Sequence, residues 1–367
     1  MRNVLFYTDS PNYGGAERQM EFLARHLPKF GYEASLACSK YSALAAKRDN
    51  LRSIYKEIYI LPTFNKHDPW HFYSLRRLLR DKKFDLLHLH LWNPGACRYA
   101  FFAGRSTKTP IVTTEHDPFE LRGIKQWIKK QCMARTDRFI AINSDNFRQL
   151  SENVQNPEGR IYRVHNGIEL GQFLDNKDKA SLGIKTGDLA LTCIAELHPR
   201  KGHSYLFDAF FRLSKNYPML HLFLVGRGPD ETRVRASSAR SPNIHLLGWR
   251  TDIPQILKAT DIFVLPSLRE AFGLSVLEAM ASGVPVVASE TSGTKDIIEN
   301  GKSGLLVPPG DAQSLMEALQ TLLNNPGQRA DLAKAGQERA KLFSAERMAK
   351  ETAEVYSDLL GTQLVTQ

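Results

Sequence analysis

The segment REAFGLSVLEAM, residues 269–280, places two carboxylates, Glu270 and Glu278, in a run that is otherwise largely apolar. Because a strand-like run ends near residue 267 and a glycine follows, we expect Glu270 in a loop and Glu278 on the second turn of a helix. The first N–H groups of that helix favour a phosphate, and they belong to Gly273, Leu274 and Ser275. Carboxylates on both sides of such a helix end suit a nucleotide sugar. A solvated loop and a surface helix explain the two glutamates equally well.

Two further segments carry groups that suit a diphosphate. Arg200 and Lys201 precede Gly202 at the expected start of a helix, where Arg offers a planar fork of donors and Lys a point charge. Gly14 and Gly15 lie between an expected strand and helix, where glycine lets the backbone approach a ligand. A solvated turn and a tight turn, respectively, are the alternatives.

Short β-rich runs alternate with helical patterns along the whole chain, which predicts an α/β fold with parallel sheets. A break rich in Gly, Asp and Lys at residues 167–188 divides the chain into two such series. We expect two Rossmann-like doubly wound domains, residues 1–170 and 171–344, that face each other across a cleft. A last helix within 345–367 is expected to cross back to the first domain. Open α/β sheets bind ligands at the carboxyl ends of their strands, so the site is expected in the loops that follow strands.

Composition narrows the class of partner. The net charge is +10, and residues 70–140 hold 14 Lys and Arg against six Asp and Glu, which favours an anionic partner. Aromatic residues are not interleaved with the basic run, so nucleic acid is not expected. The four cysteines have no close spacing, and no run of 18 apolar residues occurs. The apolar run at residues 4–7 is short and precedes polar residues, so we do not expect it to act as a signal peptide. We expect a cytoplasmic protein without disulfides.

The basic excess includes residues 121–135, LRGIKQWIKKQCMAR, which have helical periodicity. The expected arrangement is a helix whose apolar side, with Leu121, Ile124, Trp127, Ile128 and Cys132, packs on the sheet. The alternative is a helix at an anionic lipid surface, which would make the protein peripheral to the membrane.

The segment 267–311 closely resembles the donor-binding half of glycosyltransferase family 4, the retaining transferases of GT-B fold. Four other matches occur in the family's order and extend the resemblance over nearly the full chain: PNYGGAER (11–18), TEHDPF (114–119), VHNGIE (164–169) and RKG (200–202).

The resemblance implies a role for each matching residue. Glu270 would lie near the transferred sugar, and Glu278 would hold the ribose hydroxyls. Lys201, with Arg200, would stabilise charge on the departing diphosphate. The remaining donor contacts would come from the backbone of Phe272, Gly273, Leu274 and Ser275 and, in the first domain, from Gly14 and Gly15, with His116 near the sugar and acceptor.

One position departs from the family pattern. The family often has Gly-Arg where this chain has Ala195 and Glu196, so one expected arginine is absent, and Arg200 is its candidate replacement.

The implied activity is retaining transfer of a hexose from a nucleotide-diphosphate sugar to a glycan or lipid-linked acceptor in polysaccharide or glycoconjugate synthesis. No cofactor and no metal are expected. His88 and His90 form an H-x-H pair that is interpreted as structural, and Glu115 and Asp117 as polar loop residues. A nucleotide-sugar epimerase of the same fold and a basic binding protein without catalysis are the alternative classes.

Overall fold

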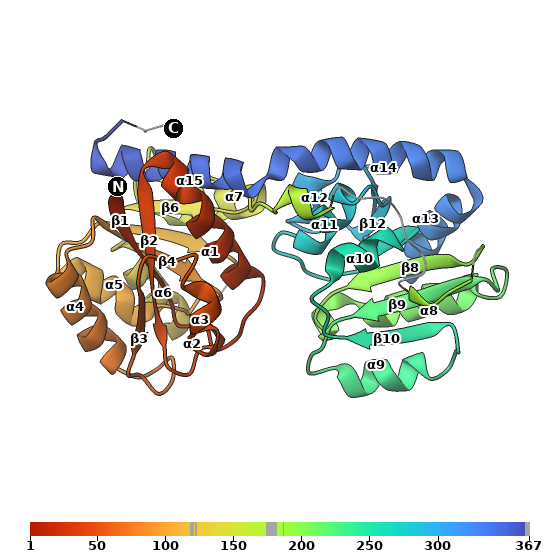
Figure 1. Ribbon diagram of the computed structural model, residues 1–367, viewed down its shortest axis with the longest axis horizontal. Helices are drawn as coiled ribbons and strands as arrows, with labels where there is room; N and C mark the ends of the chain where they lie inside the picture. Colours follow the sequence, from red (N-terminus) through yellow and green to blue (C-terminus); the bar gives the residue numbers. More distant parts are fainter. Residues whose placement is uncertain (118–120, 122, 174–181, 186, 364–367) are drawn as a thin grey trace. The chain divides into compact units, whose positions relative to one another are not determined.

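The structure is a computed structural model that describes residues 1–117, 121, 123–173, 182–185 and 187–363. The chain divides into two compact units, each drawn as a separate body in Figure 1. Unit 1 is Met1–Gly167 with Ala345–Gln367, and unit 2 is Ile168–Ser344. The division lies three residues before the expected boundary at 170. Part of the expected linker, residues 174–181 and 186, and part of the motif at 114–119 lie outside the described residues.

Unit 1 contains a parallel sheet in the order β3-β2-β1-β4-β5-β6-β7. Its strands are β1 (Arg2–Thr8), β2 (Tyr32–Ser39), β3 (Ile58–Leu61), β4 (Leu86–Leu91), β5 (Ile111–Glu115), β6 (Arg138–Ala141) and β7 (Ile161–Arg163). Its helices are α1 (Gly15–His26), α2 (Ala43–Ala46), α3 (Arg48–Leu51), α4 (Trp70–Lys82), α5 (Arg98–Ser106), α6 (Ile124–Met133), α7 (Ser144–Asn153) and α15 (Ala345–Leu360), with a 3-10 turn η1 (Leu27–Phe30).

Both faces of this sheet are buried, as a parallel sheet requires. Successive side chains of β1 alternate between the faces: Val4 and Phe6 pack with α1 and α15, whereas Leu5 and Tyr7 pack with α4 and α5. The near-continuous apolar sequence of β1 and β4 follows from this burial, because neither strand has a solvent face. Unit 1 is therefore doubly wound, as the sequence predicted.

The last helix, α15, belongs to unit 1 although it ends the chain. Its Tyr356 is fully buried and its hydroxyl lies 2.6 Å from Nδ1 of His88 on β4, while Ser357 Oγ lies 2.9 Å from the hydroxyl of Tyr32. The helix is amphipathic, and its apolar side completes the core beside α1. Unit 1 is thus built from two stretches of chain that are far apart in sequence.

Unit 2 contains a second parallel sheet in the order β10-β9-β8-β11-β12-β13. Its strands are β8 (Leu189–Ile194), β9 (Leu220–Val225), β10 (Ile244–Gly248), β11 (Ile262–Leu265), β12 (Val286–Ser289) and β13 (Leu305–Val307). Its helices are α8 (His203–Leu213), α9 (Glu231–Ser238), α10 (Ile253–Lys258), α11 (Leu274–Ala281), α12 (Thr294–Ile297), α13 (Ala312–Asn324) and α14 (Pro326–Ala340), with 3-10 turns η2 (Leu170–Phe173), η4 (Pro199–Lys201) and η5 (Lys341–Phe343).

The core of unit 2 is formed by the sheet with α8 and α13 on one side, where Leu222 and Val264 are fully buried. On the other side α11 packs against β11 and β12. The six strands that the sequence predicted for this half are all present, so the second unit is doubly wound as well.

Each sheet reverses its strand order at one place, between β1 and β4 in unit 1 and between β8 and β11 in unit 2. At such a switch point the connections leave in opposite directions, which opens a crevice at the carboxyl ends of the two strands. The loops that follow β8 and β11 are residues 195–202 and 266–273, the two segments that carry the predicted donor site.

None of the helices among the described residues combines the length and apolarity that crossing a bilayer requires.

Candidate functional site

The switch point of unit 2 brings together Lys201 and Glu270. Lys201 Nζ, from the loop after β8, donates to Glu270 Oε2, from the loop after β11. Only 13% of the Lys201 side chain and 14% of the Glu270 side chain are exposed, so the ion pair is largely withdrawn from water. Ser267 Oγ is a second, longer partner of the same carboxylate oxygen, at 3.4 Å. Two of the three predicted catalytic residues are therefore in direct contact.

A glycine allows the two loops to approach this closely. Gly202 has a φ of 69°, and a Cβ added there would lie 2.0 Å from the carbonyl oxygen of Pro266. The backbone N–H of Leu268 donates to the carbonyl of Arg200 at 2.8 Å, which fastens the loops to each other. Any larger residue at position 202 would separate the loops and the ion pair with them.

Glu278 lies on the second turn of α11, as predicted, but it is buried, with 2% of its surface exposed. The interpretation of Glu278 as a surface helix residue is therefore wrong. Gly273 precedes the helix with a φ of 100°, and its carbonyl accepts the first helical hydrogen bonds, from Val276 and Leu277. The N–H groups of Gly273, Leu274 and Ser275 thus lie at the helix start, where the helix dipole favours an anion.

A third loop, after β12, supports this helix start. Gly293 donates its N–H to the carbonyl of Glu270 at 3.1 Å, and a Cβ at position 293 would lie 2.2 Å from Cα of Phe272. Phe272 itself is 3% exposed, and its ring packs edge-on against Phe343. Gly293 is the N-cap of α12, so this loop joins the start of α12 to the loop of the predicted donor site.

Arg200 is not oriented like Lys201. Its Nη2 lies 3.0 Å from Oε2 of Glu196, four residues earlier in the same loop, and 35% and 44% of the two side chains are exposed. Glu196 is the residue that stands where the family often has arginine. Arg200, which was predicted to replace that arginine, is therefore paired with Glu196, the residue at the arginine's position.

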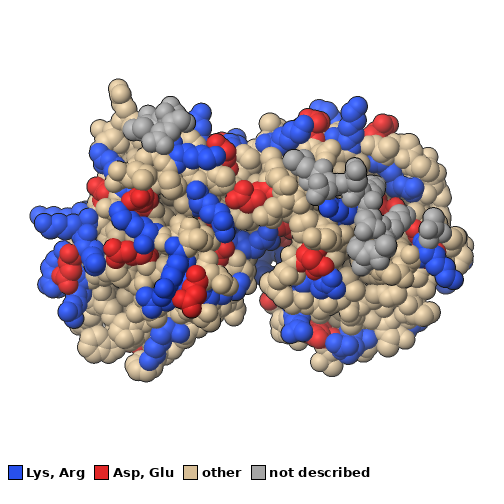
Figure 2. All heavy atoms as spheres, in the orientation of Figure 1, with Lys and Arg blue, Asp and Glu red and all other residues tan. Residues whose placement is uncertain are grey.

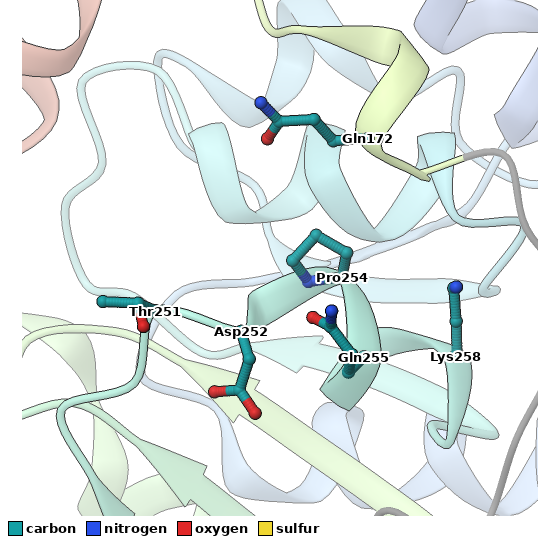
Figure 3. A pocket seen from close by; sticks show the side chains of 6 residues that line it. All are labelled: Gln172, Thr251, Asp252, Pro254, Gln255 and Lys258. Atoms are coloured by element: carbon teal, nitrogen blue, oxygen red, sulfur yellow. The ribbon is translucent and has the colours of Figure 1, made fainter.

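A hollow in unit 2 lies away from these loops. It has a volume of about 470 Å³, is open to solvent, and is lined by Gln172, Thr251, Asp252, Pro254, Gln255 and Lys258 (Figure 3). None of the predicted site residues lines it. We place the site at the switch point because Lys201, Glu270 and the N-terminus of α11 converge there, whereas none of these groups lines the hollow.

In unit 1 the glycine pair begins α1, as predicted. The N–H of Gly14 donates to Oε2 of Glu17 at 2.8 Å, and Glu17 is 3% exposed. Burial raises the pKa of the Glu17 carboxyl. Because the Gly14 N–H is engaged within the loop, the loop's shape is held by Glu17, which the sequence analysis did not single out.

His116 follows β5 and is 8% exposed. Its Nε2 lies 3.1 Å from Nδ1 of His90, which comes from the end of β4. Burial lowers the pKa of His116 to about 4, so the ring is neutral at pH 7. Within the described residues, His116 Nδ1 and His90 Nε2 have no hydrogen-bond partner. A small cavity beside them, also lined by Gln19, Asn166 and Thr352, has room for about one water molecule.

The H-x-H pair is structural in part. His88 is held by Tyr356 and by Thr114 Oγ1, which lies 2.7 Å from its Nε2, whereas His90 contacts the predicted site residue His116. No group of three or more His, Cys, Asp or Glu that could hold a metal ion occurs among the described residues. The four cysteines are all free and buried.

The interpretation of Glu115 as a polar loop residue is wrong. Glu115 ends β5 with 2% of its surface exposed, and its carboxylate accepts from Lys129 Nζ and, at 3.2 Å, from Asn146 Nδ2. Lys129 belongs to α6, so this buried ion pair fastens the basic helix beside His116. Asp117 is half-buried at the edge of the described chain.

The packing expected for the basic helix is also wrong in part. Cys132 is buried and Ile128 packs partly against the core, but Ile124 and Trp127 are 68% and 58% exposed. Lys and Arg cover more of the visible face of unit 1 than Asp and Glu do (Figure 2). The helix thus presents apolar side chains to solvent among exposed lysines.

Asp9 is a polar residue at the switch point of unit 1 that sequence reasoning missed. It follows β1 and accepts from Trp92 Nε1 and from the backbone N–H of Cys97, both at 2.8 Å. Burial raises the pKa of its carboxyl. Its position at the end of the first strand was the available signal, because loops after β1 and β4 meet there.

Two doubly wound domains, the second with a cation and a carboxylate paired at its switch point beside a helix N-terminus, fit the GT-B glycosyltransferase that the sequence resemblance predicted. The family comparisons agree: residues 13–172 match Glycosyltransferase Family 4 and residues 175–339 match Glycosyl transferases group 1. The chain belongs to glycosyltransferase family 4.

Named relatives cover most of the chain. The Escherichia coli UDP-Gal:alpha-D-GlcNAc-diphosphoundecaprenol alpha-1,3-galactosyltransferase is 27% identical over 318 residues, 80% of each protein. The phosphatidyl-myo-inositol mannosyltransferase of Mycobacterium leprae (strain TN) is 29% identical over 300 residues, 77% of this chain and 75% of that one. Anabaena HepE, solved in complex with UDP and glucose, has the same fold, with a TM-score of 0.84, 22% identity and coverage of 97% and 100%.

Proposed function

We propose that this glycosyltransferase moves a hexose from a nucleoside-diphosphate sugar to a glycan or lipid-linked acceptor, with retention of the anomeric configuration and without a metal ion. The observation that carries the proposal is the Lys201–Glu270 pair at the switch point of unit 2, beside the start of α11. In a nucleotide-sugar donor, a diphosphate adjoins a sugar. The Lys201 cation matches the diphosphate, and the Glu270 carboxylate lies near the sugar.

The donor's groups match the groups of the site in order. The diphosphate binds Lys201, Arg200 and the N–H groups at the start of α11, because these cations and N–H donors lie in the loops after β8 and β11. The buried carboxylate of Glu278 accepts hydrogen bonds from the ribose hydroxyls, and Glu270 lies near the transferred sugar. From unit 1, Gly14 and Gly15 bind the phosphates, and His116 contacts the sugar or the acceptor, as the family resemblance implies.

In the proposed transfer, the bond from the anomeric carbon to the β-phosphate oxygen breaks as the acceptor oxygen bonds to the same face of that carbon. The acceptor's proton passes to the departing phosphate oxygen, so no separate base is needed. Negative charge grows on the diphosphate, and Lys201 stabilises it where little water competes. We infer that these cations replace the divalent ion that other transferases use.

The relatives' names support the chemical class of both substrates. One acts on a diphosphoundecaprenol-linked sugar with UDP-Gal, another is a phosphatidyl-myo-inositol mannosyltransferase, and the solved Anabaena protein binds UDP and glucose. We therefore place the activity of this chain in polysaccharide or glycoconjugate synthesis.

Helix α6 supports a lipid-linked acceptor and a peripheral position on the cytoplasmic face of a membrane. Exposed Trp127 and Ile124 can enter the interface, while exposed Lys125 and Lys130 meet anionic headgroups. A matched pair of variants tests this part alone: W127S should lose co-sedimentation with anionic liposomes, whereas W249S in unit 2, where Trp249 is equally exposed at 58%, should retain it. Equal loss in both variants, or binding indifferent to lipid charge, contradicts the membrane role.

Acceptor-dependent release of nucleoside diphosphate tests the transfer itself. UDP-, GDP- and ADP-hexoses are each incubated with undecaprenyl-diphosphate-linked GlcNAc, and the product's anomeric configuration is read by NMR. Activity that survives EDTA supports the metal-free mechanism. K201M should abolish turnover, whereas K215M, which neutralises an exposed lysine of the same unit, should not. Conversion of donor without acceptor would point to an epimerase instead.

A further inference from the structure

Glu196 occupies an unusual position for a carboxylate. It follows β8 at the switch point, and its neighbours are fixed by the sheet: Ala195 donates its N–H to the carbonyl of Val225 and Leu197 to that of Arg227, both at 3.0 Å. The Glu196 carbonyl itself accepts from the N–H of His198 at 2.8 Å. The backbone at Glu196 is therefore held on both sides, and its side chain, which is 44% exposed, belongs to the loop that carries Lys201.

Both cations of this loop have carboxylate partners. Lys201 is paired with Glu270, and Arg200 is paired with Glu196 at 3.0 Å. A diphosphate that binds here must compete with one carboxylate for each cation. The two ion pairs differ in their exposure to solvent. The Lys201 pair is largely buried, whereas the side chains of the Arg200 pair are 35% and 44% exposed.

We infer that Glu196 sets the affinity of the site for the diphosphate, by holding Arg200 and by adding its own negative charge beside the phosphates. The inference rests on the proposed function, since it assumes that the diphosphate of the donor binds at this loop. Glu196 acts through Arg200 and through the field of its own charge and is therefore a positioning residue rather than a catalytic one. Its consequence is weaker retention of the nucleoside diphosphate product than a neutral residue at position 196 would give.

The variant E196Q keeps the size of the side chain and removes its charge. Because pairs this exposed are weak, we expect a modest effect, about three- to five-fold tighter binding of the nucleoside diphosphate. UDP, GDP and ADP are titrated by calorimetry into the full-length protein, and the tightest binder is used with its nucleoside. The nucleoside should bind wild type and E196Q equally, because it lacks the phosphates that Arg200 and Glu196 distinguish.

A double-mutant cycle identifies the route of the effect. R200M should weaken diphosphate binding less in wild type than in E196Q, where Arg200 no longer faces the charge of a carboxylate at position 196. E338Q is the matched control, since Glu338 pairs with Lys341 at 2.7 Å elsewhere in unit 2 and its loss changes the net charge equally. E338Q should leave the affinity within about two-fold of wild type, which excludes a general charge effect.

The outcomes separate the two proposals. A wild-type protein that binds none of the three diphosphates would overturn both the proposed function and this inference. A wild type that binds and turns over a donor, together with an E196Q variant of unchanged affinity, would overturn the inference alone. The inference also fails, with the proposed function intact, if E196Q and E338Q tighten binding equally or if E196Q tightens binding of the nucleoside as well.

Discussion

The Lys201–Glu270 pair allows stability and catalysis to be separated in one set of variants. Removing one partner of a buried ion pair typically costs about 3–5 kcal/mol, because the other charge is left without compensation. Here 13% and 14% of the side chains remain in water, so we expect about 2–4 kcal/mol for K201M. E270Q should cost less, about 1–2 kcal/mol, because its amide oxygen can still accept from Lys201.

The double variant K201M/E270Q carries no charge at either position. It should lie within about 1 kcal/mol of wild type, because neither side chain then leaves a buried charge unpaired. The cycle therefore predicts a coupling of about 2–5 kcal/mol between the two residues. All three variants should be inactive, because Lys201 stabilises the departing diphosphate and Glu270 lies beside the transferred sugar.

Hydrogen exchange of peptides from β11 and α11, followed against urea, measures the free energy of opening in unit 2 without interference from unit 1. The exposed Glu338–Lys341 pair is the control, and E338Q should change that free energy by less than about 0.5 kcal/mol. If the double variant were destabilised by as much as the two single variants together, the pair would not be coupled and the reasoning would be refuted. An active, stable double variant would refute the catalytic part.

Three other variants test the fold around the site. Burial holds the pKa of His116 and His203 to about 4 against an ordinary 6.5, so from pH 6.5 downward the unfolded chain takes up protons that the folded chain does not. The free energy of unfolding should be constant above about pH 7 and should be lower by about 2 kcal/mol per histidine at about pH 5. H203Q should flatten the pH dependence of the urea midpoint of unit 2. G202A should destabilise unit 2 by more than about 2 kcal/mol and abolish turnover, since its Cβ meets Pro266, and a thermal melt unchanged from wild type would contradict the close approach. Y356F should cost about 1–2 kcal/mol by removing a hydrogen-bond partner of buried His88, as urea denaturation of unit 1 would show; an unaltered midpoint would mean that this hydrogen bond adds nothing.

Most of the fold follows from local patterns in the sequence. Strands alternating with helices specify parallel sheets, and the buried strands of both units have the near-continuous apolar composition that parallel sheets impose. The break near residue 167 marks the change of unit because it lacks a sustained strand. The residues of the site were predicted from several motifs that match the family in order. A single segment, such as the one with Gly14 and Gly15, is a weak signal by itself.

The errors concern side chains whose surroundings are distant in sequence. Trp127 has helical spacing with Cys132, yet it is exposed, because α6 is fastened through Lys129 to Glu115 and turns only part of its apolar side to the core. Glutamate usually lies at the protein surface. Glu278 is buried because α11, the helix that carries it, packs against β11 and β12.

The sequence by itself determined the two doubly wound domains, the glycine at position 202 and the residue types of the donor site, because periodicity and turn chemistry act over a few neighbours. Only the tertiary structure decided that Lys201 pairs with Glu270, 69 residues away. Ion pairing depends on distance in space, and the order of strands at the switch point, rather than any local pattern, sets which loops meet.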